Sequence, residues 1–103
     1  MKVYIERSQI NVEAVGEYDA ESGKLTVLKG SKISSDVARS PKFRGASSIE
    51  NKRKETVKNN RTIVDVEFKS PSTASNFVTG RSTNGYIVWK DSEGRTLKEI
   101  LGR

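Results

Sequence analysis

Basic side chains, which can bind phosphate groups, are concentrated in one central stretch of this 103-residue sequence. From Ala38 to Arg61 there are eight lysines and arginines but only two glutamates, so this stretch carries a net charge of +6, equal to that of the whole chain. A local excess of positive charge attracts polyanions. The residues expected to contact nucleic acid here are Arg39, Lys42, Arg44, Lys52, Arg53, Lys54, Lys58 and Arg61.

Charge alone does not identify the partner, and three interpretations stay open. The basic stretch can bind nucleic acid, dock on an acidic protein such as a nuclease or methylase, or simply form a solvated surface. Phe43 is the only aromatic residue within it, and single-strand binding depends on aromatic stacking. We therefore expect contact with the backbone of duplex DNA, with an acidic DNA-processing protein as the alternative partner.

The residue types needed for most catalysis are missing. The chain has no cysteine and no histidine, which removes thiolate nucleophiles, the usual zinc ligands and the usual general base. Gly80 and Gly85 have the spacing of a phosphate-binding P-loop, but Tyr86 and Ile87 stand where that motif needs lysine and serine or threonine. We expect a non-enzymatic binding module without a metal or cofactor.

The elements that must position these residues follow from hydrophobic periodicity. Alternation with a period of two predicts strands at 2–6, 10–19, 24–29, 62–68 and 85–90. Helical spacing of Ile49, Arg53 and Val57, with Ser47 as a cap, predicts a helix at 48–59. A second helix is expected at 71–79, followed by a short C-terminal helical turn at the capping-box sequence Thr96–Glu99.

These elements predict one α+β domain over residues 1–103, with two main helices on one face of a mixed or antiparallel sheet of about five strands. The basic loop and helix occupy residues 34–61. Trp89 lies in a segment that is apolar on both faces, so we expect it in the core. No apolar run approaches the roughly 20 residues needed to cross a bilayer, and no signal peptide is evident, so we expect a cytoplasmic location.

A motif over residues 68–97 resembles a known family. It comprises Phe68-Lys-Ser-Pro-Ser-Thr-Ala74, Gly80-Arg-Ser-Thr-Asn-Gly85, Trp89-Lys90 and Gly94-Arg-Thr-Leu97, and the earlier Val27-Leu-Lys-Gly-Ser31 extends the likeness. The motif is similar to a bacterial and archaeal domain-of-unknown-function family whose members occur alone or C-terminal to GIY-YIG nuclease domains. That family in turn resembles the RAMA domain, which is associated with restriction enzymes and adenine methylases.

The resemblance implies an accessory role linked to DNA in a restriction-modification or nuclease setting, with no nuclease activity in this chain. Most motif residues fit architectural roles, such as capping by Ser70 and core packing by Trp89. Arg81 and Asn84 are the exceptions, because arginine binds phosphate or guanine and asparagine binds adenine through paired hydrogen bonds. We therefore add Arg81 and Asn84 to the nucleic-acid-binding candidates.

Overall fold

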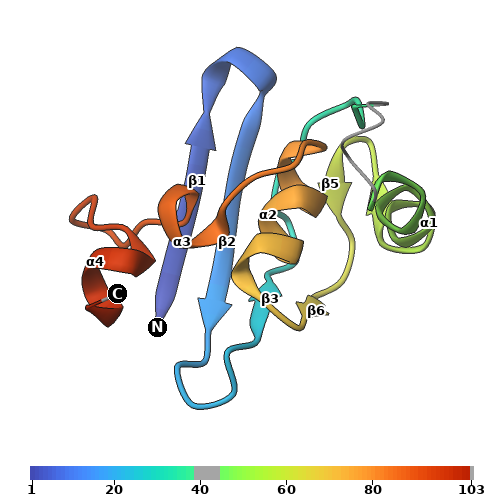
Figure 1. The fold of residues 1–103 in the computed structure, drawn as a ribbon. Coiled ribbons are helices and arrows are strands. Elements are labelled where there is room, and N and C mark those ends of the chain that lie inside the picture. The colour runs from blue at the N-terminus through green and yellow to red at the C-terminus, as the bar shows by residue number, and fades with distance from the viewer. Residues whose placement is uncertain (39–44, 103) are drawn as a thin grey trace.

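The structure, a computed structural model, describes residues 1–38 and 45–102, and its centre is a four-stranded antiparallel sheet (Figure 1). The strand order is β1-β2-β3-β6. A short 3-10 helix, Ser8–Ile10, joins the first two strands. The α+β class is confirmed, and the sheet is antiparallel throughout. The strands are β1 at Lys2–Arg7, β2 at Val12–Tyr18, β3 at Leu25–Val27 and β6 at Val66–Phe68.

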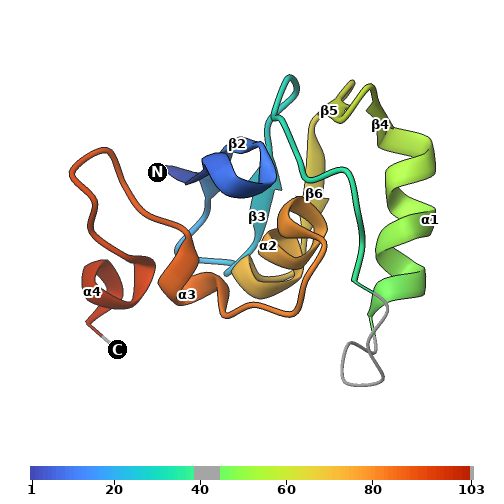
Figure 2. The same cartoon turned by 90° about the horizontal axis from the view of Figure 1, so that it is seen from above.

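One face of the sheet is covered and the other is open. In β2, Val12, Ala14 and Tyr18 are buried while Glu13 and Glu17 are exposed, as the alternation predicted. Helix α2, Pro71–Thr79, packs on the buried face against β2, β3 and β6. Figure 2 shows α2 and the short helix α3, Gly85–Val88, on this same side of the strands.

The remaining helices are α1 and α4. Helix α1, Ala46–Thr56, contacts α2 and the short strand β4, and it lies at one end of the molecule beyond β6 (Figure 2). It begins after Gly45 without a side-chain cap, so the expected Ser47 cap is wrong. The chain ends in α4, Leu97–Leu101, which packs against α3, and the Thr96–Glu99 capping box is confirmed.

The predicted strand at 85–90 is wrong, because Gly85–Val88 forms helix α3. Asn84 caps this helix by accepting a hydrogen bond from the Tyr86 amide at 3.0 Å. The Gly85 amide donates to Ser72 Oγ, and a Cβ on Gly85 would overlap the backbone of Pro71. Close packing on the start of α2 therefore overrides the strand preference of a Tyr-Ile-Val-Trp sequence.

The strands predicted at 24–29 and 62–68 pair with each other in the structure, and their ladder is interrupted between the Val27–Val66 pair and the Lys32–Arg61 pair. On one side of the interruption β3 pairs with β6. On the other side β5, Arg61–Thr62, pairs with the segment around Ser31 and Lys32. In the interrupted part the Lys29 amide donates to Asp65 Oδ1 at 2.8 Å. Ile63 and Val64 lie in the same part and are 46% and 45% exposed.

The core lies between the sheet and α2, and Trp89 belongs to it. Trp89 is fully buried, and its indole N–H donates to the carbonyl of Pro71 at 3.0 Å, which confirms the core assignment. Ser70 caps α2 and the helix spans Pro71–Thr79, as predicted, and Gly80 ends it in the left-handed conformation. The buried apolar residues are Val3, Ile5, Val12, Ala14, Tyr18, Leu25, Val27, Ile33, Ile49, Val66, Phe68, Ala74, Phe77, Val78, Trp89 and Leu97.

Candidate nucleic-acid interface

A tight hairpin follows α1 directly and carries two of the expected basic residues. Strand β4, Val57–Lys58, pairs with β5 so that Lys58 stands opposite Arg61. The two loop residues, Asn59 and Asn60, have φ values of 52° and 62°. Asparagine tolerates this left-handed conformation, and two such residues form the turn that suits a two-residue hairpin. The sequence prediction instead placed these residues at the end of the helix.

The hairpin formed by β4 and β5 is connected to strand β2 of the main sheet through Lys32. Lys32 bridges to Glu13 of β2 on one side and to Arg61 of β5 on the other. Since directly opposed residues in antiparallel strands share a face and lie about 5 Å apart at Cβ, Lys32, Arg61 and Lys58 form a row of three neighbouring cations. We call these three residues the basic row. At the Lys32 end of the row the next residue is Glu13, which stands opposite Glu6.

The basic row has little internal charge compensation. Among the described residues none of its three members forms an ion pair, although Arg61 donates to the Gly30 carbonyl at 3.1 Å. Lys58 and Arg61 are exposed and Lys32 is half-buried. Like charges placed directly opposite one another destabilise a sheet. A bound polyanion would remove that repulsion.

Helix α1 adds exposed cations beside the hairpin. Lys52 and Lys54 are both exposed, and Lys54 lies in the last turn. Positive charge at a helix C-terminus also stabilises the helix dipole, so Lys54 has a structural use as well. Ile49 and Thr56 are buried, so the helix turns one stripe inward and leaves these lysines on the solvent side.

Arg53, one of the expected nucleic-acid contacts, lies on the inner side of α1 with its guanidinium bonded to oxygens of the protein itself. Its guanidinium donates to Phe77 O at 2.6 Å, to Ser34 O at 2.8 Å and to Ser34 Oγ at 3.0 Å. It also lies 5.9 Å from the centre of the Phe77 ring. Burial lowers the pKa of Arg53 to about 10, so the side chain is still charged at neutral pH. Arg53 therefore connects α1 to α2 and to Ser34 in the segment that precedes α1.

The remaining predicted site residues are scattered. Arg39, Lys42 and Arg44 lie outside the described residues. Arg81 is exposed on the loop after α2, on the helix-covered side of the sheet, whereas the basic row lies on the open side. The Asn84 side-chain oxygen is used as the cap of α3. The structure therefore brings together Lys58, Arg61 and the unpredicted Lys32, with Lys52 and Lys54 on the adjoining helix.

Lys32 was missed because its position depends on contacts between distant segments. It lies outside the dense basic stretch and is 29 residues from Arg61 in sequence, but the antiparallel pairing of the two segments places them side by side. The available signal was the alternation of Ser31, Lys32 and Ile33, in which Ser31 and Ile33 are buried and Lys32 is not.

Hydrogen bonds and a close backbone contact hold the loop from Gly80 to Gly85 in place. Asn76 Oδ1 accepts hydrogen bonds from both the amide and the hydroxyl of Thr83, at 2.7 and 2.9 Å. Gly80 has a φ of 70°, and a Cβ there would overlap the carbonyl of Asp36. The loop is fixed by its own side chains, and among its polar residues Arg81 extends from it into solvent.

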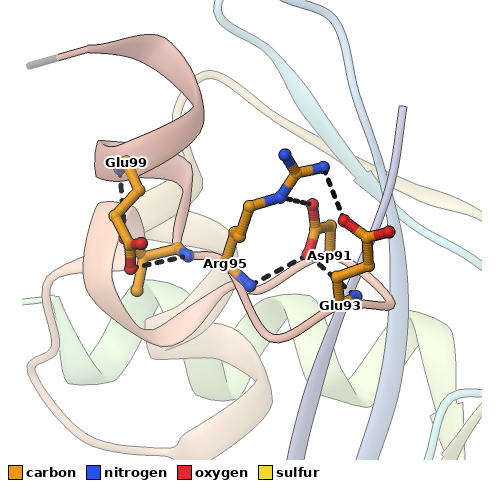
Figure 3. A network of polar contacts seen from close by, with 5 residues as sticks. Asp91, Glu93, Arg95 and Glu99 are labelled. Carbon is orange, nitrogen blue, oxygen red and sulfur yellow. Dashed lines mark hydrogen bonds and ion pairs between the residues drawn. The ribbon is translucent and has the colours of Figure 1, made fainter.

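A network of acidic and basic side chains fixes the turn before α4 (Figure 3). Asp91 accepts from the amides of Glu93 and Arg95 and from Arg95 Nε at 2.8 Å. The backbone hydrogen bond from Arg95 is the main reason that the pKa of Asp91 is lowered, and the bond to Asp91 raises the pKa of Arg95. These acids are thus occupied by the turn itself. In the described residues no group of three or more Asp or Glu side chains is placed to hold a metal ion.

The described chain is a compact α+β unit with one basic edge, and no helix in that part of it is long and apolar enough to span a membrane. The sequence matches the family model described as a domain of unknown function, DUF4357, over residues 3–101. Because the match covers nearly the whole sequence, the chain belongs to this family. No curated protein and no solved structure matches the chain.

Proposed function

We propose that this chain is a non-enzymatic accessory module that binds duplex DNA through the edge formed by α1 and the β4–β5 hairpin. The observation that carries the proposal is the basic row, in which Lys32, Arg61 and Lys58 lie side by side without an ion pair among the described residues. A row of cations on a sheet extension neutralises phosphates along a backbone, which is the main source of non-specific DNA affinity.

The motif likeness noted above supports a DNA-linked setting for this activity. Domains similar to this one accompany GIY-YIG nucleases, and the likeness to RAMA domains points to restriction and methylation enzymes. In such a setting the module would hold DNA for a catalytic partner, since the chain itself has no cysteine or histidine. Arg39, Lys42 and Arg44 precede α1 in the sequence, and the proposal includes them as further phosphate contacts.

Salt-titrated binding to random duplex DNA tests the proposal. Each neutralised phosphate contributes about 0.9 to the slope of log affinity against log salt. The double variant Lys58→Gln/Arg61→Gln should bind more weakly, with the slope reduced by about 1.8. The control Lys2→Gln/Lys98→Gln removes the same charge from exposed positions on β1 and α4 and should leave the slope unchanged. Equal slopes for the two double variants would contradict binding at the basic row.

A second candidate is a module that docks on an acidic protein through the same edge. It is favoured by Ile63 and Val64, two exposed apolar side chains next to the basic row that phosphate contacts do not use. Exposed apolar residues rimmed by charge are typical of protein interfaces. A folded protein that fails to bind random DNA at about 50 mM salt, where phosphate contacts are strong, would favour this second candidate.

A further inference from the structure

The open face of the sheet has an acidic half and a basic half that lie side by side. The basic half is the basic row, Lys32, Arg61 and Lys58. The acidic half is formed by Glu6 of β1 and Glu13 of β2, which stand directly opposite each other. Glu13 also stands opposite Lys32, so the acids and the cations follow one line across the strands. Along this line the charge changes sign once, between β2 and Lys32.

Neither half is compensated within the described part of the chain. Glu6 and Glu13 are exposed, and among the described residues neither carboxylate forms an ion pair, even though Glu13 stands opposite Lys32. Like charges directly opposite each other destabilise a sheet, and each half contains such a pair. Each half therefore presents charge that a surface of the opposite sign would stabilise.

Half-buried apolar side chains lie beside the charged line on the same face. Val15 stands opposite Tyr4 in the register of β1 and β2. Leu28 donates its amide to the Val15 carbonyl at 2.8 Å and follows the buried Val27, so alternation places its side chain on the open face. Tyr4, Val15 and Leu28 are all half-buried. Packing against another sheet would bury the remaining apolar surface of these side chains.

The charged line is complementary to a second copy of itself. Consider a two-fold axis that runs parallel to the strands at the change of sign, between β2 and Lys32. This axis places the acidic half of one copy over the basic row of the other, and the reverse. Glu13 then faces Lys32 of the second copy. Glu6, one strand further from the axis, faces Arg61 of the second copy.

The same axis also suits the rest of the open face. Val15 faces Leu28 of the second copy, which brings two apolar side chains together. A further row of paired residues crosses the strands from Lys2 through Glu17 and Thr26 to Glu67. In this row Lys2 faces Glu67 and Glu17 faces Thr26. None of these contacts places like charges against each other.

We propose that two copies of this chain pair through their open faces, with the acidic half of each copy on the basic row of the other. The pairing needs protein alone, so it does not rest on the proposed contact with DNA. It covers the basic row, however, and a second copy and duplex DNA would therefore compete for that row.

Sedimentation equilibrium of the full chain without DNA tests the pairing. The wild type should form a dimer at low salt and less of it as the salt concentration rises, because salt screens contacts between exposed charges. The association should stop at two copies, since a two-fold contact uses the same surface on both.

Charge reversal on the two sides of the axis tests the contact itself. Glu13→Lys and Lys32→Glu should each weaken dimerisation about tenfold or more, since each opposes like charges twice in a two-fold pair. An equimolar mixture of the two variants should dimerise again, because each reversed charge then meets an opposite one, and the double variant Glu13→Lys/Lys32→Glu should do the same. The matched controls Glu21→Lys, in the turn after β2, and Lys98→Glu, in α4, change exposed residues outside this face and should leave dimerisation unchanged.

The proposal is overturned if the chain stays monomeric at millimolar concentration and low salt, or if it grows into assemblies larger than a dimer. It is also overturned if the two single variants dimerise like the wild type, or if their mixture stays monomeric while both keep the circular dichroism spectrum of the wild type. The outcome is separate from that of the DNA proposal. A monomer that binds duplex DNA through the basic row overturns the dimer alone, and a dimer without affinity for DNA overturns the DNA contact alone.

Discussion

Arg53 shows why charge in a sequence does not reveal where a side chain points. It belongs to the densest basic run of the chain, Lys52-Arg53-Lys54, yet it alone of the three turns toward the core. The signal for this was present, because Arg53 lies four residues after Ile49, which is buried, and four before Val57, which is half-buried. Arginine can occupy such a position because its aliphatic part packs while its five donors find carbonyl oxygens.

We expect Arg53→Ala to lower the free energy of unfolding by about 2–3 kcal/mol, since it removes charge-assisted hydrogen bonds that connect α1 to Ser34 and Phe77. The exposed neighbour provides a matched control, and Lys54→Ala should change stability by no more than about 0.5 kcal/mol. Urea unfolding followed by tryptophan fluorescence measures both. A stability loss that is equal in the two variants would show that the Arg53 contacts are not structural.

At the scale of elements, the ends of α2 were predicted well, and the packing between segments that are distant in sequence was not. Ser70, Pro71 and Gly80 bound α2 as their residue types indicate, because caps depend on a few neighbouring residues. Residues 85–90 have the composition of a strand, but Gly85–Val88 form a helix because Gly85 must pack on Pro71 and Trp89 must reach the core. These packing contacts involve a segment more than ten residues away, and hydrophobic periodicity carries no information on such contacts.

The basic row required a similar long-range arrangement. Alternation predicted strands at 24–29 and 62–68, but not that they lie side by side, where the Lys29 amide bonds to Asp65 and the Ser31 amide to Thr62 across the strands. Ser31 Oγ donates to Leu28 O at 2.7 Å, and its amide donates to Thr62 Oγ1 at 3.0 Å. The register that pairs Val27 with Val66 continues to Lys32, which it places opposite Arg61. The sequence therefore indicated a basic region, and the structure supplies its geometry.

The turn that Asp91 organises should make stability depend on pH in the acid range. Hydrogen bonds lower the folded-state pKa of Asp91 below its ordinary value of 3.8, so its ionised form stabilises the fold above that value. This contribution is lost as the pH falls through the lower folded-state pKa. Asp91→Asn should thus be less stable than the wild type at pH 7, and the difference should shrink below about pH 4.

Urea unfolding of the wild type and Asp91→Asn from pH 7 to pH 2.5 measures this difference. Arg95→Gln serves as the control, because it removes the side-chain partner at 2.8 Å but keeps the backbone amide that is the main cause of the lowered pKa. It should therefore retain part of the acid-range dependence. A difference between wild type and Asp91→Asn that stays constant down to pH 2.5 would contradict this account of the turn.

Across the whole molecule the charges are separated on the open side of the sheet. The open face of the main sheet carries exposed glutamates on β1, β2 and β6, whereas the hairpin and α1 present exposed lysines and an arginine. Two of the glutamates are partly neutralised, Glu17 by the N-terminal amine at 2.8 Å and Glu67 by Lys24 at 3.4 Å. The boundary between the two regions lies at the bridge between Glu13 and Lys32. A duplex placed on the basic row would meet like charge beyond that boundary, which limits the contact to one edge.

Reversing the charge at this boundary tests whether the boundary sets the extent of the DNA contact. Glu13→Lys adds a fourth cation next to Lys32, so DNA affinity should rise and the log–log salt slope should increase by about 0.9. The added repulsion should lower stability by about 0.2–1 kcal/mol, as expected for like charges directly opposite in a sheet. Glu67→Lys, an exposed position on β6, makes the same change in net charge away from the row and should alter the slope much less. If both variants raise the slope equally, total charge and not the basic row governs binding, and the interface must be sought elsewhere on the surface.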